Sequence, residues 1–82
     1  WLDFVAQGLL LVTEHIEQPG VIGQMGTLLG EEGINISFVQ VGRQKRGGPG
    51  LMVVGLDDPI GDETLARVIA MPSVRSARVI KL

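Results

Sequence analysis

The stretch HIEQPGVIG, residues 15–23, combines the only histidine of the chain with a nearby carboxylate. On an extended segment, side chains two positions apart point to the same side, so Glu17 could orient the imidazole of His15 for acid–base catalysis. The nearby serines and threonines belong to no nucleophile elbow or acid–base motif, so a catalytic centre would lack its nucleophile. We therefore expect no catalytic residue in this chain.

The Pro-Gly turn in the same stretch suggests a binding site instead. A helix N-terminus leaves backbone N–H groups without intrahelical partners. Proline is favoured at this position because the N–H that it lacks would have no partner in the helix, as at Pro19. The backbone amides of Gly20, Val21 and Ile22 are then free to bind a carboxylate beside the imidazole. The alternative is purely structural: Glu17 complements the helix dipole and His15 is an ordinary strand residue.

Three glycines recur in the helical pattern that follows the turn: Gly20, Gly23 and Gly26. Their spacing of three differs from the G-x-G-x-x-G spacing of a dinucleotide-binding loop, so a phosphate site is not indicated. Glycine costs a helix about 1 kcal/mol relative to alanine, so something is expected to pack closely along this side. A neighbouring strand, a partner subunit or a ligand would each explain the glycines.

Charge and composition exclude several classes of partner. The 82 residues carry a net charge of −2, which gives no basic field for nucleic acid or anionic membranes. Base stacking on central strands would have only Phe38, and the cations Arg43, Lys45 and Arg46 are typical of a solvated hairpin tip. No apolar run approaches the roughly 18 residues of a membrane span. We expect a soluble, cytoplasmic protein with neither nucleic-acid nor membrane partner.

The residue types also argue against metals and disulfides. The chain has no cysteine, which rules out thiolate ligands and disulfide bonds. A single histidine cannot form a His-rich metal site, so we expect no metal.

Hydrophobic periodicity predicts four strands and two helices in one domain. Residues 9–16 are apolar and branched, as in a strand buried on both faces, whereas 34–41 alternate with period two and place Ile34, Ile36 and Phe38 on one face. Residues 51–56 follow a turn-rich segment, 43–50, and so form a hairpin with the preceding strand. The last strand, 74–82, alternates imperfectly, which indicates a bulge.

The helices are predicted at roughly residues 19–32 and from Asp62, a plausible N-cap, to Met71-Pro72. The order strand, helix, strand, strand, helix, strand predicts an α+β fold, a ferredoxin-like βαββαβ sandwich. Its four-stranded antiparallel sheet would carry both helices on one face. The other face and an edge strand remain uncovered, and pairing with a second copy would cover them.

Three motifs resemble those of the ACT domain family: H-x-x-x-P-G-V from His15, G-x-N-I from Gly33 and P-x-x-R-S-A-x-V from Pro72. The resemblance is closest to the C-terminal regulatory domain of D-3-phosphoglycerate dehydrogenases and runs from about Gly8 to Leu82. It implies that residues 1–7 are the end of a linker from a preceding domain and that 8–82 form an ACT regulatory domain.

The resemblance also implies a non-catalytic, amino-acid-sensing domain that forms a homodimer through its second strand. In serine-regulated relatives, L-serine lies between the turn before the first helix and the second strand of the neighbouring copy, which assigns ligand contacts to His15 and Asn35. No cofactor is expected here, since NAD would bind the missing catalytic part. The remaining alternatives are a purely structural oligomerisation domain and a regulatory domain of another amino-acid enzyme.

One position departs from the serine-sensitive pattern, which has asparagine two residues before the proline where this chain has Glu17. An amide both donates and accepts hydrogen bonds, whereas an ionised carboxylate only accepts. Glu17 could therefore hold the ammonium group of an amino acid or repel its carboxylate.

Overall fold

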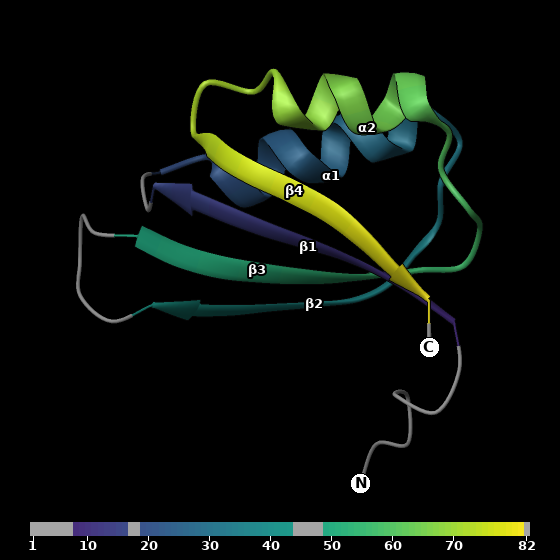
Figure 1. Ribbon diagram of the computed structural model, residues 1–82, viewed down its shortest axis with the longest axis horizontal. Coiled ribbons are helices and arrows are strands. Elements are labelled where there is room, and N and C mark those ends of the chain that lie inside the picture. The colour runs from purple at the N-terminus through teal and green to yellow at the C-terminus, as the bar shows by residue number, and fades with distance from the viewer. Residues whose placement is uncertain (1–7, 17–18, 44–48, 82) are drawn as a thin grey trace, which may run out of the picture.

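The computed structural model describes residues 8–16, 19–43 and 49–81, which form a four-stranded sheet with two helices on one face (Figure 1). The strands pair antiparallel in the order β2-β3-β1-β4. The predicted βαββαβ sandwich is therefore confirmed. In chain order the elements are β1 (Leu9–Ile16), α1 (Val21–Glu31), β2 (Ile36–Arg43), β3 (Pro49–Leu56), α2 (Asp62–Ile69) and β4 (Val74–Lys81).

The core lies between the sheet and the helices, and β1 supplies its centre. Alternate β1 side chains point to the helices, so Leu11, Thr13 and His15 are buried. The core is completed by Met25, Leu29, Met52, Val54 and Val68, each at most 1% exposed. Burying one such apolar side chain contributes about 1.5–3 kcal/mol. The hydroxyl of Thr13 donates to the Met52 carbonyl oxygen at 3.4 Å, so its burial is compensated.

The other face of β1 differs from the prediction that this strand is buried on both faces. Leu10, Val12 and Ile16 are only half-buried, and Glu14 is exposed. Both helices lie on the opposite side of the sheet (Figure 1), so no helix within the described residues covers this second face. We call this side of the sheet, which carries Leu10, Val12 and Glu14 of β1, the open face.

A bulge in β2 changes the face on which its later side chains lie. Ile36 pairs with Leu56 but Phe38 pairs with Gly55, so Ser37 is the extra residue. Phe38 therefore moves to the open face, and the prediction that it shares a face with Ile36 is wrong. Gly55 makes room for this arrangement, because a Cβ there would overlap the Phe38 ring and the Ser37 hydroxyl.

The predicted bulge in β4 is confirmed. His15 pairs with Val74 while Glu14 pairs with Ser76, which leaves Arg75 as the extra residue. The N-cap of α2 is Gly61, so the prediction of Asp62 was wrong by one position. Asp62 instead lies in the first turn, where a carboxylate interacts favourably with the helix dipole.

The two helices have 11 and 8 residues. Within the described ranges, no helix is long and apolar enough to cross a membrane.

Two glycine-to-alanine substitutions should have opposite effects on stability. Gly55→Ala forces the Phe38 ring and the Ser37 hydroxyl to move, so we expect a loss of about 1–3 kcal/mol in the free energy of unfolding. Gly26→Ala adds a methyl group that meets nothing within 4 Å inside α1, so we expect a gain of about 0.5–1 kcal/mol. Urea unfolding followed by circular dichroism measures both. A Gly55→Ala variant as stable as the parent would contradict the close packing of Phe38.

Candidate functional site

His15 lies at the end of β1, with its side chain on the helix-covered face and only 1% exposed. Its neighbours across the sheet are Gly50 on β3 and Val74 on β4. A Cβ at Gly50 would lie 3.2 Å from Cε1 and 3.4 Å from Nε2 of the imidazole. A side chain at position 50 would therefore be in tight contact with the ring. Gly50 was not predicted as a site residue, because it lies in a glycine- and proline-rich stretch typical of a turn.

The N-terminus of α1 follows β1 after a short turn. Gly20 is the N-cap with φ 91°, in the left-handed region that favours glycine, and its carbonyl oxygen accepts the first helical hydrogen bond from Gln24 at 2.9 Å. As a glycine, Gly20 offers no side chain to cap the helix, and the first turn of α1 contains no acidic residue. Helix geometry leaves the first-turn amides without intrahelical acceptors, and the contact of Gly20, Val21 and Ile22 with a ligand carboxylate stays a prediction.

The predicted site residues differ in exposure. Val21 is 4% exposed and packs in the core, so only its backbone can face a ligand, whereas Ile22 is 52% exposed. Glu17, the remaining residue of the predicted turn, lies outside the described residues.

Asn35 lies just before β2, at the end of the sheet opposite to His15. The side-chain amide of Asn35 donates to a carboxylate oxygen of Asp57. The backbone carbonyl oxygen of Asn35 accepts a hydrogen bond from the backbone N–H of Asp57 at 3.0 Å. The register places Ile36 beside Leu56 at this end, whereas Gly50 pairs with His15 at the opposite end. Six residues of strand separate the two ends, roughly 20 Å. His15 and Asn35 are therefore not brought together within one chain.

A shallow groove of about 530 Å³ runs along α1 from its N-terminus towards α2. Nothing among the described residues lies within 4 Å of a Cβ added at Gly20, Gly23 or Gly26. Of the three explanations for these glycines, a neighbouring strand of the same chain is therefore excluded for the described part. The groove is lined by Gly20, Gly23, Gln24, Thr27, Leu28, Glu31 and Arg67.

The far end of the groove is closed by a polar cluster between the two helices. The Arg67 guanidinium donates to Glu32 at 2.6 Å and to Glu31 at 3.0 Å, and the Thr64 hydroxyl donates to Glu32 at 2.6 Å. The Thr64 hydrogen bond and then Arg67 lower the pKa of Glu32 below its ordinary value. Because two carboxylates engage Arg67, this cation is not free to receive a ligand carboxylate.

Among residues 8–16, 19–43 and 49–81, no three histidine or carboxylate side chains gather where they could hold a metal ion.

The βαββαβ fold, with a buried histidine near the end of its first strand, is shared with a known family. The sequence model of the ACT domain family matches residues 9–70, so the chain belongs to this family.

The chain is also similar to D-3-phosphoglycerate dehydrogenases along nearly its whole length. It is 36% identical to the Methanocaldococcus jannaschii enzyme over 81 residues, which are 99% of this chain and 16% of the relative. It is 40% identical to the Synechocystis sp. enzyme over 73 residues, which are 89% of this chain and 13% of the relative. The Bacillus subtilis enzyme is 35% identical over 81 residues, 99% of this chain and 15% of the relative. The chain thus spans only a small part of these relatives.

Two solved structures share the fold. The ligand-free regulatory subunit of aspartate kinase from Thermus thermophilus aligns with a TM-score of 0.67 at 17% identity, covering 93% of this chain and 52% of that one. The C-terminal domain of the MgtC protein from Mycobacterium tuberculosis aligns with a TM-score of 0.66 at 14% identity, covering 100% of this chain and 94% of that one.

The polar cluster predicts how acid affects stability. A lowered folded-state pKa means that Glu32 stabilises the fold above its unfolded pKa, near 4.3, and that this contribution is lost as pH falls through the folded value. We expect Glu32→Gln to lower stability at pH 7 and to flatten the decline below about pH 4.3. Thr64→Val should move the decline to higher pH, because it removes the hydroxyl donor. Urea unfolding between pH 2.5 and 7 measures this, with exposed Asp58→Asn as the control. If the free energy of unfolding of Glu32→Gln falls with acid as it does in the parent, Glu32 is not the group responsible for this pH dependence.

Proposed function

We propose that this chain is the non-catalytic regulatory domain of an NAD-dependent D-3-phosphoglycerate dehydrogenase and that it binds an amino acid, with L-serine as the effector. Residues 1–7 would end a linker from the preceding domain, and residues 8–82 would form the regulatory unit of a cytoplasmic enzyme of serine biosynthesis. The observation that carries the proposal is the buried His15 near the end of β1, the strand that precedes α1 in the chain, in an ACT domain similar to those dehydrogenases.

The homodimer supplies what a single chain lacks. β2 is an edge strand, so one row of its backbone N–H and C=O groups is available to pair with another strand. In an antiparallel pair of β2 strands, the start of one lies beside the end of the other. The end of β2 pairs with Gly50 and through it with His15. Asn35 from the second chain would thereby approach the His15 end of the first.

The chemistry of the site suits an amino-acid zwitterion. The effector carboxylate meets the amides of residues 20–22, and the imidazole of His15 donates a further hydrogen bond. Asn35 from the second chain can both donate to and accept from a serine hydroxyl. Because His15 is only 1% exposed, contact with a ligand requires a displacement of the residues that cover its ring. In this proposal the displacement reaches the start of α1, which is a means of signalling to a catalytic domain.

A second candidate function is a purely structural dimerisation domain. One observation favours it: Asn35 is already engaged by Asp57 within its own chain. In that case the site residues stabilise the fold and no effector binds.

Two substitutions at Asn35 and its partner distinguish these candidates. If L-serine is the effector, His15→Ala and Asn35→Ala should each weaken binding by about 1–3 kcal/mol, since a buried polar partner loses its hydrogen bond. Asp57→Ala removes the contact within the chain but keeps the Asn35 amide, so it should bind serine with nearly unchanged affinity. Calorimetry on the 82-residue chain measures all three. If Asn35→Ala and Asp57→Ala weaken serine binding equally, Asn35 acts only through its contact with Asp57 in its own chain.

Glu17 tests the departure from the serine-sensitive pattern. If its carboxylate repels that of serine, Glu17→Asn should strengthen serine binding by about tenfold or more, because an amide can donate where a carboxylate cannot. If Glu17 instead holds the ammonium group, the same change should weaken binding. The same calorimetric titration reads both results. No serine binding to either chain would leave the structural domain as the better explanation, and other amino acids would then be titrated.

The edge strand predicts where the homodimer forms. Val39 on β2 is 41% exposed, and Val39→Lys should raise the dimer dissociation constant at least tenfold by placing a charge at the paired edge. Ile69→Lys is the matched control, because Ile69 is 48% exposed on α2, away from this edge. Sedimentation equilibrium at micromolar concentration measures the constants. Equal effects of the two lysines would contradict pairing through β2.

A further inference from the structure

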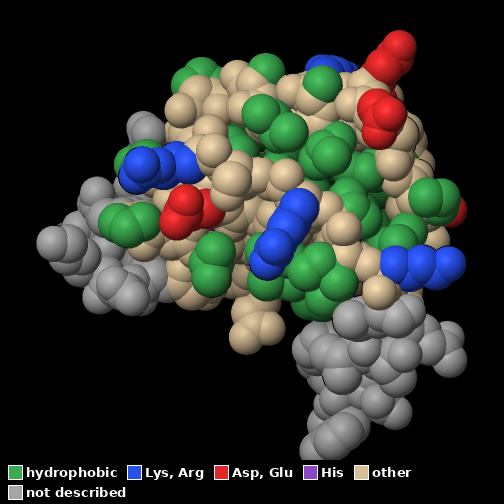
Figure 2. All heavy atoms as spheres, viewed as in Figure 1, with side chains coloured by type: hydrophobic (Ala, Val, Ile, Leu, Met, Phe, Trp, Pro, Cys, Tyr) green, Lys and Arg blue, Asp and Glu red, His purple; other side chains and the backbone are tan. Residues whose placement is uncertain are grey.

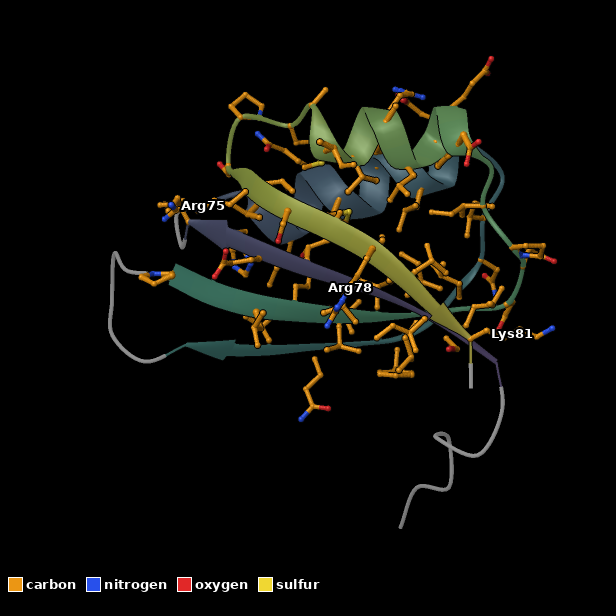
Figure 3. All side chains as sticks on the ribbon, in the orientation of Figure 1. Arg75, Arg78 and Lys81 are labelled. Atoms are coloured by element: carbon orange, nitrogen blue, oxygen red, sulfur yellow. The ribbon has the colours of Figure 1, made fainter. Side chains whose placement is uncertain are left out.

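The open face of the sheet is largely apolar. The strand register places side chains of all four strands on it, including Leu10, Val12, Phe38, Leu51, Val53 and Ile80. Leu51 is 53% exposed. Figure 2 shows apolar side chains gathered around a basic one, Arg78, which Figure 3 labels near the middle of the sheet. An antiparallel sheet with one face in water normally carries polar side chains there, so this surface has the character of an interface.

Two opposite charges lie on the open face. Glu14 on β1 pairs with Ser76, and Arg78 on β4 pairs with Val12, so the two are diagonal neighbours on adjacent strands. Both line a hollow of about 350 Å³ with an apolar floor that includes Val12 and Leu51. The described part of the chain contains no ion pair from either Glu14 or Arg78, whereas Arg67 on the helices pairs with two carboxylates. The other described residues that the register pairs on this face are uncharged, and the bulge residue Arg75, labelled in Figure 3 at the start of β4, adds a second basic group at the edge.

The pair of charges formed by Glu14 and Arg78 is self-complementary. A two-fold axis in the plane of the interface, passing between Glu14 and Arg78, places each of these side chains opposite the other one of a second copy. The two ion pairs are then equivalent, and the apolar surface around them is covered by the same surface of the second chain. A self-complementary arrangement needs one acidic and one basic group on the same patch, as found here.

The area is sufficient for a specific contact. Four strands of eight residues present a face of roughly 19 Å by 26 Å, or about 500 Å² per copy. Pairing two copies covers about 1,000 Å², the lower range for a specific protein–protein interface.

We propose that the open face binds the open face of a second copy, with Glu14 of each chain paired with Arg78 of the other. This contact is separate from the β2 edge, so both can form in one assembly. The face-to-face contact does not require effector binding.

Charge exchange tests this contact directly on the 82-residue chain. Glu14→Arg and Arg78→Glu each place like charges across the interface, so either should raise the dissociation constant of the face-to-face contact at least tenfold. The double variant Glu14→Arg/Arg78→Glu restores opposite charges and should return within about threefold of the parent. Sedimentation equilibrium should show the assembly mass halved in each single variant and restored in the double variant. This holds whether the remaining unit is one chain or a pair joined through β2.

Two controls change the net charge equally without touching the open face: Glu63→Arg on α2 and Lys81→Glu at the end of β4. Both should leave the mass unchanged, and circular dichroism checks that every variant is folded. If the charge exchanges alter the mass no more than the controls, the proposal is overturned, and a preceding domain is then the better candidate to cover this face. A double variant that stays dissociated also overturns it, because the two charges then do not meet each other. Neither result bears on the β2 dimer, because Val39→Lys tests that contact in a separate experiment.

Discussion

The structure depends on the alternation of side chains along β1. This strand pairs with β3 on one side and β4 on the other, so its register determines which residues of three strands share a face. Leu11 and Thr13 are fully buried against the helices by this register, and His15 follows in the same row. The imidazole of the candidate site is therefore fixed by the same constraint that builds the core. If a ligand contacts His15 as proposed, it would act on the packing at the end of β1, and binding would then be coupled to conformation.

Two bulges adapt this regular sheet to its surroundings. The extra residue Ser37 moves Phe38 to the open face, where it packs over Gly55. The extra residue Arg75 lies in β4 between Val74, which pairs with His15, and Ser76, which pairs with Glu14. One bulge thus increases the apolar character of the open face, and the other lies beside both the candidate site and the charged hollow. Bulges redirect side chains locally without changing the order of strands.

Much of the fold could be predicted from the sequence because its elements have clear periods. β1 was predicted at residues 9–16 with the bounds observed, and the irregular alternation after residue 74 correctly indicated a bulge. The bulge at Ser37 escaped prediction, because Phe38 continues the period-two pattern and only the space left by Gly55 across the sheet allows the shift. The N-cap of α2 was misplaced by one residue because Asp62 has the right side chain for a cap, whereas the backbone places Gly61 there.

The candidate site was less predictable, because its geometry depends on residues distant in sequence. Gly50 makes room for His15 from another strand, and the hydrogen bonds of Thr64 and Arg67 to Glu32 join two helices, so neither follows from local spacing. Asn35 cannot reach His15 within one chain, so its assigned role needs a second chain. The central claim is that the turn before α1 and Asn35 together hold an amino acid across a dimer. Titration of ¹⁵N-labelled chain with L-serine, followed by NMR, tests this most directly. We expect concerted shifts of the backbone amides of residues 20–22 and of the Asn35 side-chain amide, saturating at one serine per site; shifts confined to one of these two places, or none at either, would contradict the claim.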